Sequence, residues 1–314
     1  MFQRIKDIID KGRTFLVTTH VDPDGDAVGS AFALCFALAG LGKDAAVYLQ
    51  GPVPYRYRSL PRPAVVHHRL PGGTYDGVFV VDCGSLLRVG DAHESLKHKG
   101  FLINIDHHEA NEAFGQINVI DERASSTAEI LYLILKALDV RFTLDVAANL
   151  YVAVLTDTGS FRNGNTTERA FSICKEMISL GVSPASVAIK VYESHPKERL
   201  HLLCLVLATL ETFHEDRIAL AHVTGDMFAQ THTNAEYAEG FVDYLKEIDT
   251  VEVACLLREL AGGKYNVSMR SKNTVDVAAI ARSLGGGGHR KAAGCTLEGD
   301  LNTVKNRVLG AFSL

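Results

Sequence analysis

Four short apolar runs in the first half of the chain constrain its fold most strongly. They cover residues 15–19, 45–49, 78–82 and 101–106 and are separated by segments of helical character. Strands that are buried on both faces of a parallel sheet have continuous apolar runs of this kind. The alternation therefore predicts an α/β domain in which helices flank a mostly parallel sheet.

Helices are expected between and after these strands, over residues 27–39, 144–156 and 166–180. Another begins at Ser126, because Ser126-Thr127-Ala128-Glu129 is a capping-box pattern that precedes an apolar segment. At 314 residues the chain is long enough for two domains. We expect a first domain over 1–185, a helical linker over 186–212 with a long helix at 197–211, and a second domain over 213–314.

The second half has the pattern of a smaller α+β domain. We expect strands at 217–224, 251–259 and 264–271, a short strand near Cys295, and helices at 236–248, 275–284 and the C-terminus. Gly262-Gly263 predicts a two-residue hairpin turn between the second and third of these strands, since both glycines tolerate positive φ. Gly285–Gly288 is expected to be a loop.

The charge of the chain is distributed unevenly. The net charge is −5, which argues against a protein that coats long duplex nucleic acid. Residues 256–314 carry nine basic and four acidic side chains, a balance of +5, which leaves −10 for residues 1–255. The acidic part suits cation binding, and the basic part suits an anionic substrate.

The sequence predicts a cytoplasmic protein without a membrane partner. Residues 1–13 read as a charged amphipathic helix rather than a secretory signal, and the apolar segment 27–42 is shorter than the roughly 18 residues a membrane span needs. Six cysteines are scattered without a C-x-x-C pair, as expected of small core residues in a reducing compartment.

Acidic residues cluster directly after the first predicted strand, in His20-Val21-Asp22-Pro23-Asp24-Gly25-Asp26. Crowded carboxylates repel one another unless cations neutralise them, so a metal site is the simplest explanation. The alternative is an Asp-rich turn with a helix cap. Asp82, Asp106 and Asp157 also end apolar runs, and carboxylates at strand ends converge at the rim of a sheet. Separate capping roles for all of these residues are improbable, which favours the metal site.

These motifs, in this order, resemble those of the DHH phosphoesterases, which are named for a triplet such as Asp106-His107-His108. Gly285-Gly286-Gly287-Gly288-His289 resembles the signature of the DHH-associated C-terminal substrate domain. The resemblance covers nearly the whole chain and implies two domains with an active-site cleft between them. The length of the chain, and the direct joining of one DHH domain to one C-terminal domain, resemble those of the bacterial nano-RNase and pAp-phosphatase group.

The resemblance also implies roles for the motif residues. One metal ion would be held by His20, Asp24 and Asp82, and a second by Asp26, Asp82, His107 and Asp157. Imidazole and carboxylate ligands suit two Mn²⁺ ions, with Mg²⁺ or Co²⁺ as substitutes. Among the catalytic residues, Asp106 would orient a ligating imidazole, His108 would contact the phosphate or the leaving oxygen, and Asp22 would hold the water or support its loop.

A phosphate of the substrate is expected to bind in the second domain. The predicted substrate-binding residues are Gly287, Gly288, His289, Arg270, Ser271 and Arg258, because glycine N–H groups and arginines bind anions. Two alternatives stay open, namely that the glycine run is a flexible connector and that Arg258 faces solvent. Arg162 is equally compatible with a role in the cleft or with an exposed loop.

The expected substrates are short oligoribonucleotides of a few residues and the 3′-phosphate of adenosine bisphosphate, pAp. A RecJ-like single-strand exonuclease, an inorganic pyrophosphatase and a non-catalytic nucleotide sensor are the alternatives. RecJ-type exonucleases carry additional domains that grip long single strands, and we expect a chain of this size to lack them. The oligomeric state stays open, a homodimer included.

Overall fold

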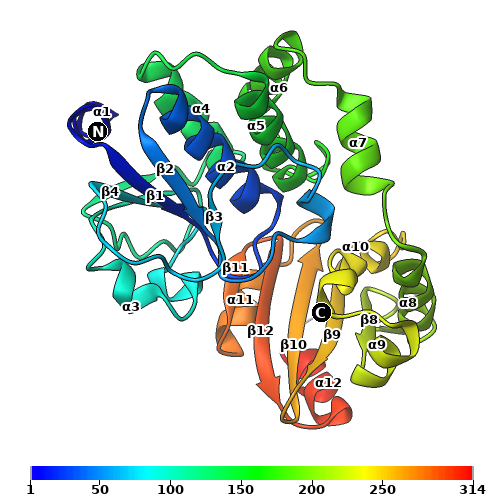
Figure 1. Ribbon diagram of the computed structural model, residues 1–314. Coiled ribbons are helices and arrows are strands. Elements are labelled where there is room, and N and C mark those ends of the chain that lie inside the picture. Colours follow the sequence, from blue (N-terminus) through cyan, green and yellow to red (C-terminus); the bar gives the residue numbers. More distant parts are fainter. Residues whose placement is uncertain (1, 313–314) are drawn as a thin grey trace. The chain divides into compact units, whose positions relative to one another are not determined.

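The computed structural model describes residues 2–312, which form two compact units divided between Ser194 and His195. Helix α7 (Pro184–Tyr192) lies in the first unit and helix α8 (Lys197–Leu207) lies in the second. The predicted domain boundaries, with a separate linker over 186–212, stay a prediction. Figure 1 labels the helices and strands of both units.

The first unit is built on a six-stranded sheet in which every pair of neighbours is parallel. The strand order is β3-β2-β1-β4-β5-β6. The four strands expected from apolar runs are confirmed within one residue. The bounds are β1 (Thr14–Thr18), β2 (Asp44–Tyr48), β3 (Val66–His67), β4 (Gly77–Val81), β5 (Phe101–Asp106) and β6 (Ile117–Ile120).

Helices cover both faces of this sheet, as its continuous apolar strands require. One face of the sheet forms a large apolar core together with five helices, which are α1 (Phe2–Lys11), α2 (Gly25–Gly40), α4 (Thr127–Ala137), α5 (Leu144–Asp157) and α6 (Glu168–Ser179). The other face packs on a smaller core beneath the 3₁₀ turn η2 (Leu86–Val89) and the short helix α3 (His93–Leu96). A further 3₁₀ turn, η1, spans Tyr55–Tyr57.

Helices α2 and α5 approach each other closely at Gly29. A Cβ atom on Gly29 would lie 2.6 Å from the carbonyl oxygen of Asn149 and 2.9 Å from Cβ of Ala153. The absence of a side chain therefore lets the two helix backbones come together. This contact sets the spacing between Asp26, in the first turn of α2, and Asp157, the last residue of α5.

The second unit is a mixed α+β layer structure. Its six-stranded sheet has the order β11-β12-β10-β9-β8-β7, and only β8 and β9 pair in parallel. The strands are β7 (Glu211–Phe213), β8 (Ile218–Val223), β9 (Val253–Leu260), β10 (Lys264–Ser271), β11 (Gly287–His289) and β12 (Ala292–Glu298). The remaining helical elements are α9 (Gly225–Thr231), η3 (Ala235–Ala238), α10 (Phe241–Lys246), α11 (Val277–Ser283) and α12 (Leu301–Gly310).

Four local expectations for this half were wrong. Leu260 pairs with Lys264, so the hairpin loop has three residues and uses the positive φ of Gly262 and Gly263 after Ala261. The helix expected over 236–248 is interrupted at Gly240, whose φ is 78°. The helix expected over 197–211 ends at Leu207. Part of the expected glycine loop is strand β11.

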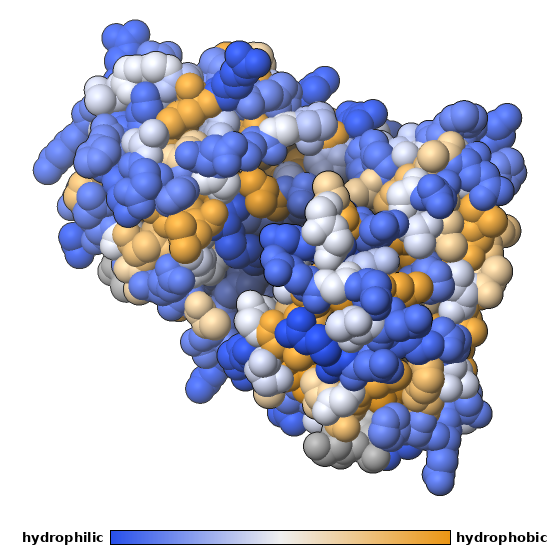
Figure 2. Space-filling view, turned by 90° about the horizontal axis from the view of Figure 1, so that it is seen from below, coloured by the Kyte–Doolittle hydropathy of each residue, from blue (hydrophilic) through white to orange (hydrophobic). Residues whose placement is uncertain are grey.

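Hydrophilic side chains, blue in Figure 2, cover most of the face shown there, and hydrophobic ones occur in scattered groups. Within residues 2–312, none of the helices combines the length and the apolar character required to cross a lipid bilayer.

Candidate metal centre

The acidic motifs meet at the carboxyl edge of the parallel sheet. Strand order reverses between β1 and β4, because β1 connects to β2 on one side and β4 connects to β5 on the other. Open α/β sheets bind ligands at such a switch point. The loop after β1 carries His20, Asp82 follows β4, and Asp106 ends β5, so these side chains come from three neighbouring strands.

Two helices supply the remaining carboxylates. Asp24 is the N-cap of α2, where its Oδ1 accepts a hydrogen bond from the Ala27 N–H at 3.0 Å. Asp26 lies in the first turn of the same helix. Asp157 ends helix α5 rather than a strand, and its Oδ2 lies 3.7 Å from Nε2 of His107. A helix end thus brings this carboxylate to the same rim.

Asp82 is at the centre of the cluster. Its oxygens lie 3.7 Å from Nε2 of His20, 3.7 Å from Nε2 of His107 and 3.8 Å from Nδ1 of His108. Three groups of side chains, each with ligand atoms within 4.8 Å of one another, share Asp82. They are His20, Asp24 and Asp82; Asp26, Asp82 and His107; and Asp82, Asp106 and His108.

The backbone at Asp82 has a conformation that is uncommon for a residue with a side chain. Its φ is 54°, and that of Asp22 is 51°. Left-handed backbone costs energy for residues other than glycine, and such residues concentrate at functional sites. The Asp82 side chain is 3% exposed, and its Oδ1 accepts a hydrogen bond from the Thr127 hydroxyl at 3.0 Å. The surrounding structure therefore holds this carboxylate in a fixed position.

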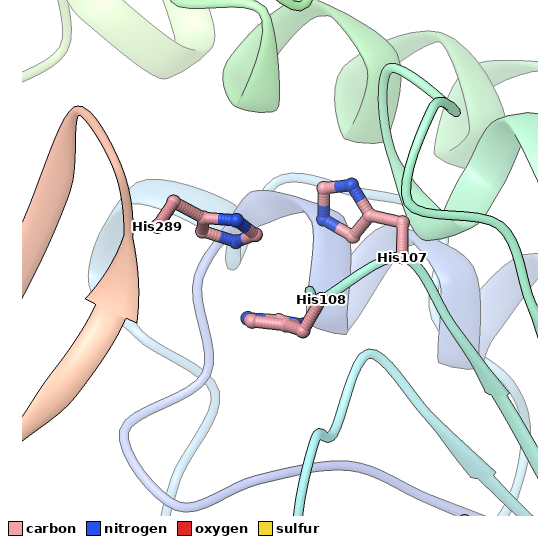
Figure 3. Close-up of side chains that lie close together, drawn as sticks. All are labelled: His107, His108 and His289. Carbon is pink, nitrogen blue, oxygen red and sulfur yellow. The ribbon is translucent and has the colours of Figure 1, made fainter. Parts of the chain in front are cut away.

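Two imidazole rings present a nitrogen lone pair to these carboxylates. Nδ1 of His20 lies 2.8 Å from the carbonyl oxygen of Val21, and Nδ1 of His107 lies 3.3 Å from that of Ala124. A carbonyl only accepts hydrogen bonds, so both Nδ1 atoms carry the proton and neutral Nε2 has a lone pair. Figure 3 shows His107 with His108, whose rings are inclined at 68°. Either a proton on Nε2 or a metal ion between each ring and the carboxylates would satisfy this arrangement.

The pKa values show how the cluster responds when protons take the place of a cation. Burial chiefly raises the pKa of Asp26 well above its usual value, and Asp82 and Asp157 raise it further. Burial likewise raises the pKa of Asp157 to about 7. Burial alone would lower the pKa of His107, but Asp157, Asp82 and Asp26 outweigh burial and raise that pKa to about 9. The donor set therefore fits divalent cations, which displace protons from such sites.

The thermal stability of chelator-treated protein is expected to fall as the pH rises. Asp157 and His107 bind protons more tightly when folded than when unfolded, so their stabilisation is present at low pH and is lost through about pH 7 and about pH 9. Melting temperatures from pH 5 to pH 9, with EDTA or with Mn²⁺, measure this. We expect the metal to remove most of the decline, and Asp157→Asn to remove part of it. A flat profile in EDTA would contradict the expectation.

Asp106 and His108 form a separate pair beside the cluster. Nδ1 of His108 donates to Oδ1 of Asp106 at 2.7 Å, and the Asn111 amide donates to the other oxygen of Asp106 at 2.6 Å. Asp106 thus orients His108, whereas the sequence suggested that it orients a ligating imidazole. Asp22 belongs to none of the metal-ligand groups found among residues 2–312.

The predicted substrate residues lie on different faces of the second sheet. Arg258 pairs directly with Asn266, and Arg270 follows Asn266 by four residues on β10, so both arginines are on the same face. Ser271 is turned to the opposite face, where it is 4% exposed and its hydroxyl donates to the Val275 carbonyl. The structure thus separates Ser271 from the two arginines.

Gly287, Gly288 and His289 form the edge strand β11. A Cβ atom on Gly288 would lie 2.6 Å from the carbonyl oxygen of Ala292, and its φ of 137° favours glycine. Nothing lies within 4 Å of a Cβ atom on Gly287. Gly287 and Gly288 therefore lie in a paired strand, whereas Gly285 and Gly286 connect it to α11. In the first unit, Nε of Arg162 donates to the Gly159 carbonyl at 2.9 Å, and its role stays open.

Sequence reasoning missed several neutral residues that hold the candidate ligands. The N–H groups of Thr127 and Ala128 donate to the Asp26 carboxylate at 2.6 and 3.1 Å. The Asn165 amide donates to Oδ2 of Asp157 at 3.0 Å. The capping box before α4 marked the first two, whereas Asn165 had no signal because it lies in an irregular loop.

Two family descriptions match the chain. "DHH family, N-terminal domain" matches residues 14–155, and "DHHA1 domain" matches residues 218–312. A Thermus thermophilus protein named bifunctional oligoribonuclease and PAP phosphatase NrnA is 35% identical over 94% of this chain and 88% of that protein. A Streptococcus mutans protein, named as a probable enzyme of the same kind, is 30% identical over 83% of this chain and 82% of its own.

Solved structures share the fold. An exopolyphosphatase-related protein from Bacteroides fragilis has a TM-score of 0.89 at 23% identity, over 99% of this chain and 94% of that one. Thermus thermophilus RecJ, solved with Mn²⁺, has a TM-score of 0.57 at 16% identity, over 99% of this chain and 54% of RecJ. The family matches and the 35% identical relative show that the chain belongs to the DHH family and carries a DHHA1 domain.

Proposed function

We propose that this chain is a phosphoesterase that uses two Mn²⁺ ions to hydrolyse short oligoribonucleotides and to remove the 3′-phosphate of pAp. The names of two relatives that align with most of the chain support the substrate class. The observation that carries the chemistry is the position of Asp82, which lies within 4 Å of the facing nitrogens of three histidines.

The ligand atoms divide into two sets around Asp82. His20, Asp24 and Asp82 would hold one ion, and Asp26, Asp82, His107 and Asp157 would hold the other. When bound, the ions would lower the pKa of a bound water toward neutrality and would neutralise charge on the phosphate. Imidazole and carboxylate donors suit Mn²⁺, with Mg²⁺ or Co²⁺ as substitutes. Cys83 follows Asp82 in the sequence, but its thiol donates to the Ser85 carbonyl, so we leave it out of the ligand set.

The remaining residues would bind and orient the substrate. The Asp106 carboxylate fixes the ring of His108, whose Nε2 would contact the phosphate or the leaving oxygen. Asp22, with its left-handed backbone, would support the loop that carries His20 and Asp24. Arg258, Arg270 and the N–H groups of Gly287, Gly288 and His289 would bind a phosphate of the substrate. Ser271 would support the end of β10, where its hydroxyl bonds Val275.

A comparison of four substrates tests the proposal. Turnover is measured with Mn²⁺ on a 5′-phosphorylated diribonucleotide, pAp, inorganic pyrophosphate and a long single-stranded DNA. We expect the first two to be hydrolysed fastest, because the relatives named for these activities align with nearly all of this chain. Three results would each reject the proposed function: dominant cleavage of pyrophosphate, a preference for the long DNA strand, or substrate binding without turnover. Cytoplasmic location and a homodimer stay predictions.

A further inference from the structure

Glu129 is a buried carboxylate one turn behind the candidate metal centre. Its side chain is 2% exposed, and it lies in the first turn of α4. Oε2 accepts hydrogen bonds from the Ser125 N–H at 3.1 Å and from the Ser125 hydroxyl at 2.7 Å. Oε1 accepts one from Nη1 of Arg169 at 2.9 Å. Both oxygens therefore have partners, as a buried carboxylate requires.

The contacts of Glu129 differ from those of an ordinary capping box. In that motif the glutamate bonds the N–H of the N-cap residue, which here is Ser126. Glu129 instead binds both the backbone and the side chain of the preceding residue, Ser125. It therefore fixes the segment that leads into the helix and does not only satisfy the helix terminus.

That segment, residues 124–128, contacts three candidate ligands and is linked to a fourth through Asn165. The Ala124 carbonyl faces Nδ1 of His107, and the Thr127 hydroxyl donates to Asp82. The N–H groups of Thr127 and Ala128 donate to Asp26. The Ser125 carbonyl accepts a hydrogen bond at 2.8 Å from the Asn165 amide, which also donates to Asp157.

We propose that Glu129 is a positioning residue that, by binding Ser125, fixes residues 124–128 and thereby sets the affinity of the site for divalent ions. The inference rests on the proposed function, because it concerns the same site. Groups that hydrogen-bond metal ligands directly, here those of residues 124, 127 and 128, orient the ligands, and the loss of such a group typically costs 10–100-fold in metal affinity. Glu129 acts on these groups through Ser125.

Glu129→Gln tests the proposal directly. The amide keeps the size of the side chain but replaces one acceptor oxygen with an NH₂ donor. The single remaining oxygen cannot accept the hydrogen bonds of both Ser125 and Arg169. We expect the dissociation constant for Mn²⁺, measured by calorimetry on the full chain, to rise about 10-fold. Turnover at saturating Mn²⁺ should change much less than turnover at limiting Mn²⁺. If Glu129 had a merely structural role, Glu129→Gln would lower the melting temperature in EDTA, and turnover at limiting and at saturating Mn²⁺ would change by the same factor.

Ser125→Ala is the second variant, because it removes the hydroxyl and keeps the buried carboxylate. If Glu129 acts through Ser125, the variant with both substitutions should bind Mn²⁺ only slightly less tightly than whichever single variant has the lower Mn²⁺ affinity. Glu176→Gln is the matched control, since Glu176 accepts hydrogen bonds from Tyr132 and Lys136 and is outside this network.

The outcomes separate this inference from the proposed function. Unchanged Mn²⁺ affinity in folded Ser125→Ala and Glu129→Gln, with tight binding by the parent chain, would overturn the inference alone. If Glu129→Gln does not fold, unchanged affinity in Ser125→Ala is sufficient. A parent chain without bound Mn²⁺ would overturn the proposed function itself.

Discussion

Asp82→Asn is expected to lower Mn²⁺-dependent turnover of a 5′-phosphorylated diribonucleotide by on the order of 10³-fold. Asparagine preserves the size of the side chain but removes its charge and replaces one ligand oxygen with an NH₂ group. Asp82 belongs to all three groups of ligand atoms around it. Its loss therefore weakens both proposed ion positions at once. Initial rates at several Mn²⁺ concentrations measure the effect.

Asp44→Asn is the matched control for this variant, because Asp44 is an exposed carboxylate paired with Arg13 on the same sheet. It should retain the activity of the parent chain. Circular dichroism should show that Asp82→Asn is folded. If this folded variant kept more than a tenth of the parent turnover, the two-ion assignment around Asp82 would be wrong.

Gly29→Ala is expected to lower the free energy of unfolding by about 2–3 kcal/mol. The added methyl group would lie 2.6 Å from a backbone oxygen of α5, so the two helices must separate. Because α2 carries Asp26 and α5 carries Asp157, the separation should also weaken Mn²⁺ binding. Urea denaturation in EDTA measures the stability, and calorimetry measures the binding.

Gly40→Ala is the control for helix propensity, since it lies at the end of the same helix and nothing is within 4 Å of an added Cβ atom. Alanine is the better helix former, so this variant should be equal to or slightly more stable than the parent chain. Equal stability of the Gly29 and Gly40 variants would show that the close approach of α2 and α5 is unimportant.

The central strands of the first unit were predictable because each is buried on both faces and reads as an unbroken apolar run. β3 was not, because Val66–His67 has two partly buried residues at the edge of the sheet. In the second unit, Gly240 interrupts an otherwise helical pattern by adopting positive φ. A single sequence does not show which glycines take that conformation, so the break could not be foreseen.

The candidate site was predictable only as far as it depends on charged residues. Carboxylates and imidazoles at the ends of apolar runs mark a rim, and the structure brings His20, Asp24, Asp26, Asp82, His107 and Asp157 together there. Thr127, Asn111 and Asn165 are neutral, and their partners are distant in sequence. The alternation of β10 showed which of its residues share a face, but the pairing of Arg258 with Asn266, which puts Arg258 and Arg270 on the same face, needed the structure.

The distribution of the ligands along the chain has a consequence for biosynthesis. His20 follows the first strand, whereas Asp157 ends a helix completed only after all six strands have been translated. A ribosome-bound nascent chain that stops before α5 would lack one side of the pocket, so the complete ligand set would exist only after α5 is translated, while α6 and α7 of the same unit still follow.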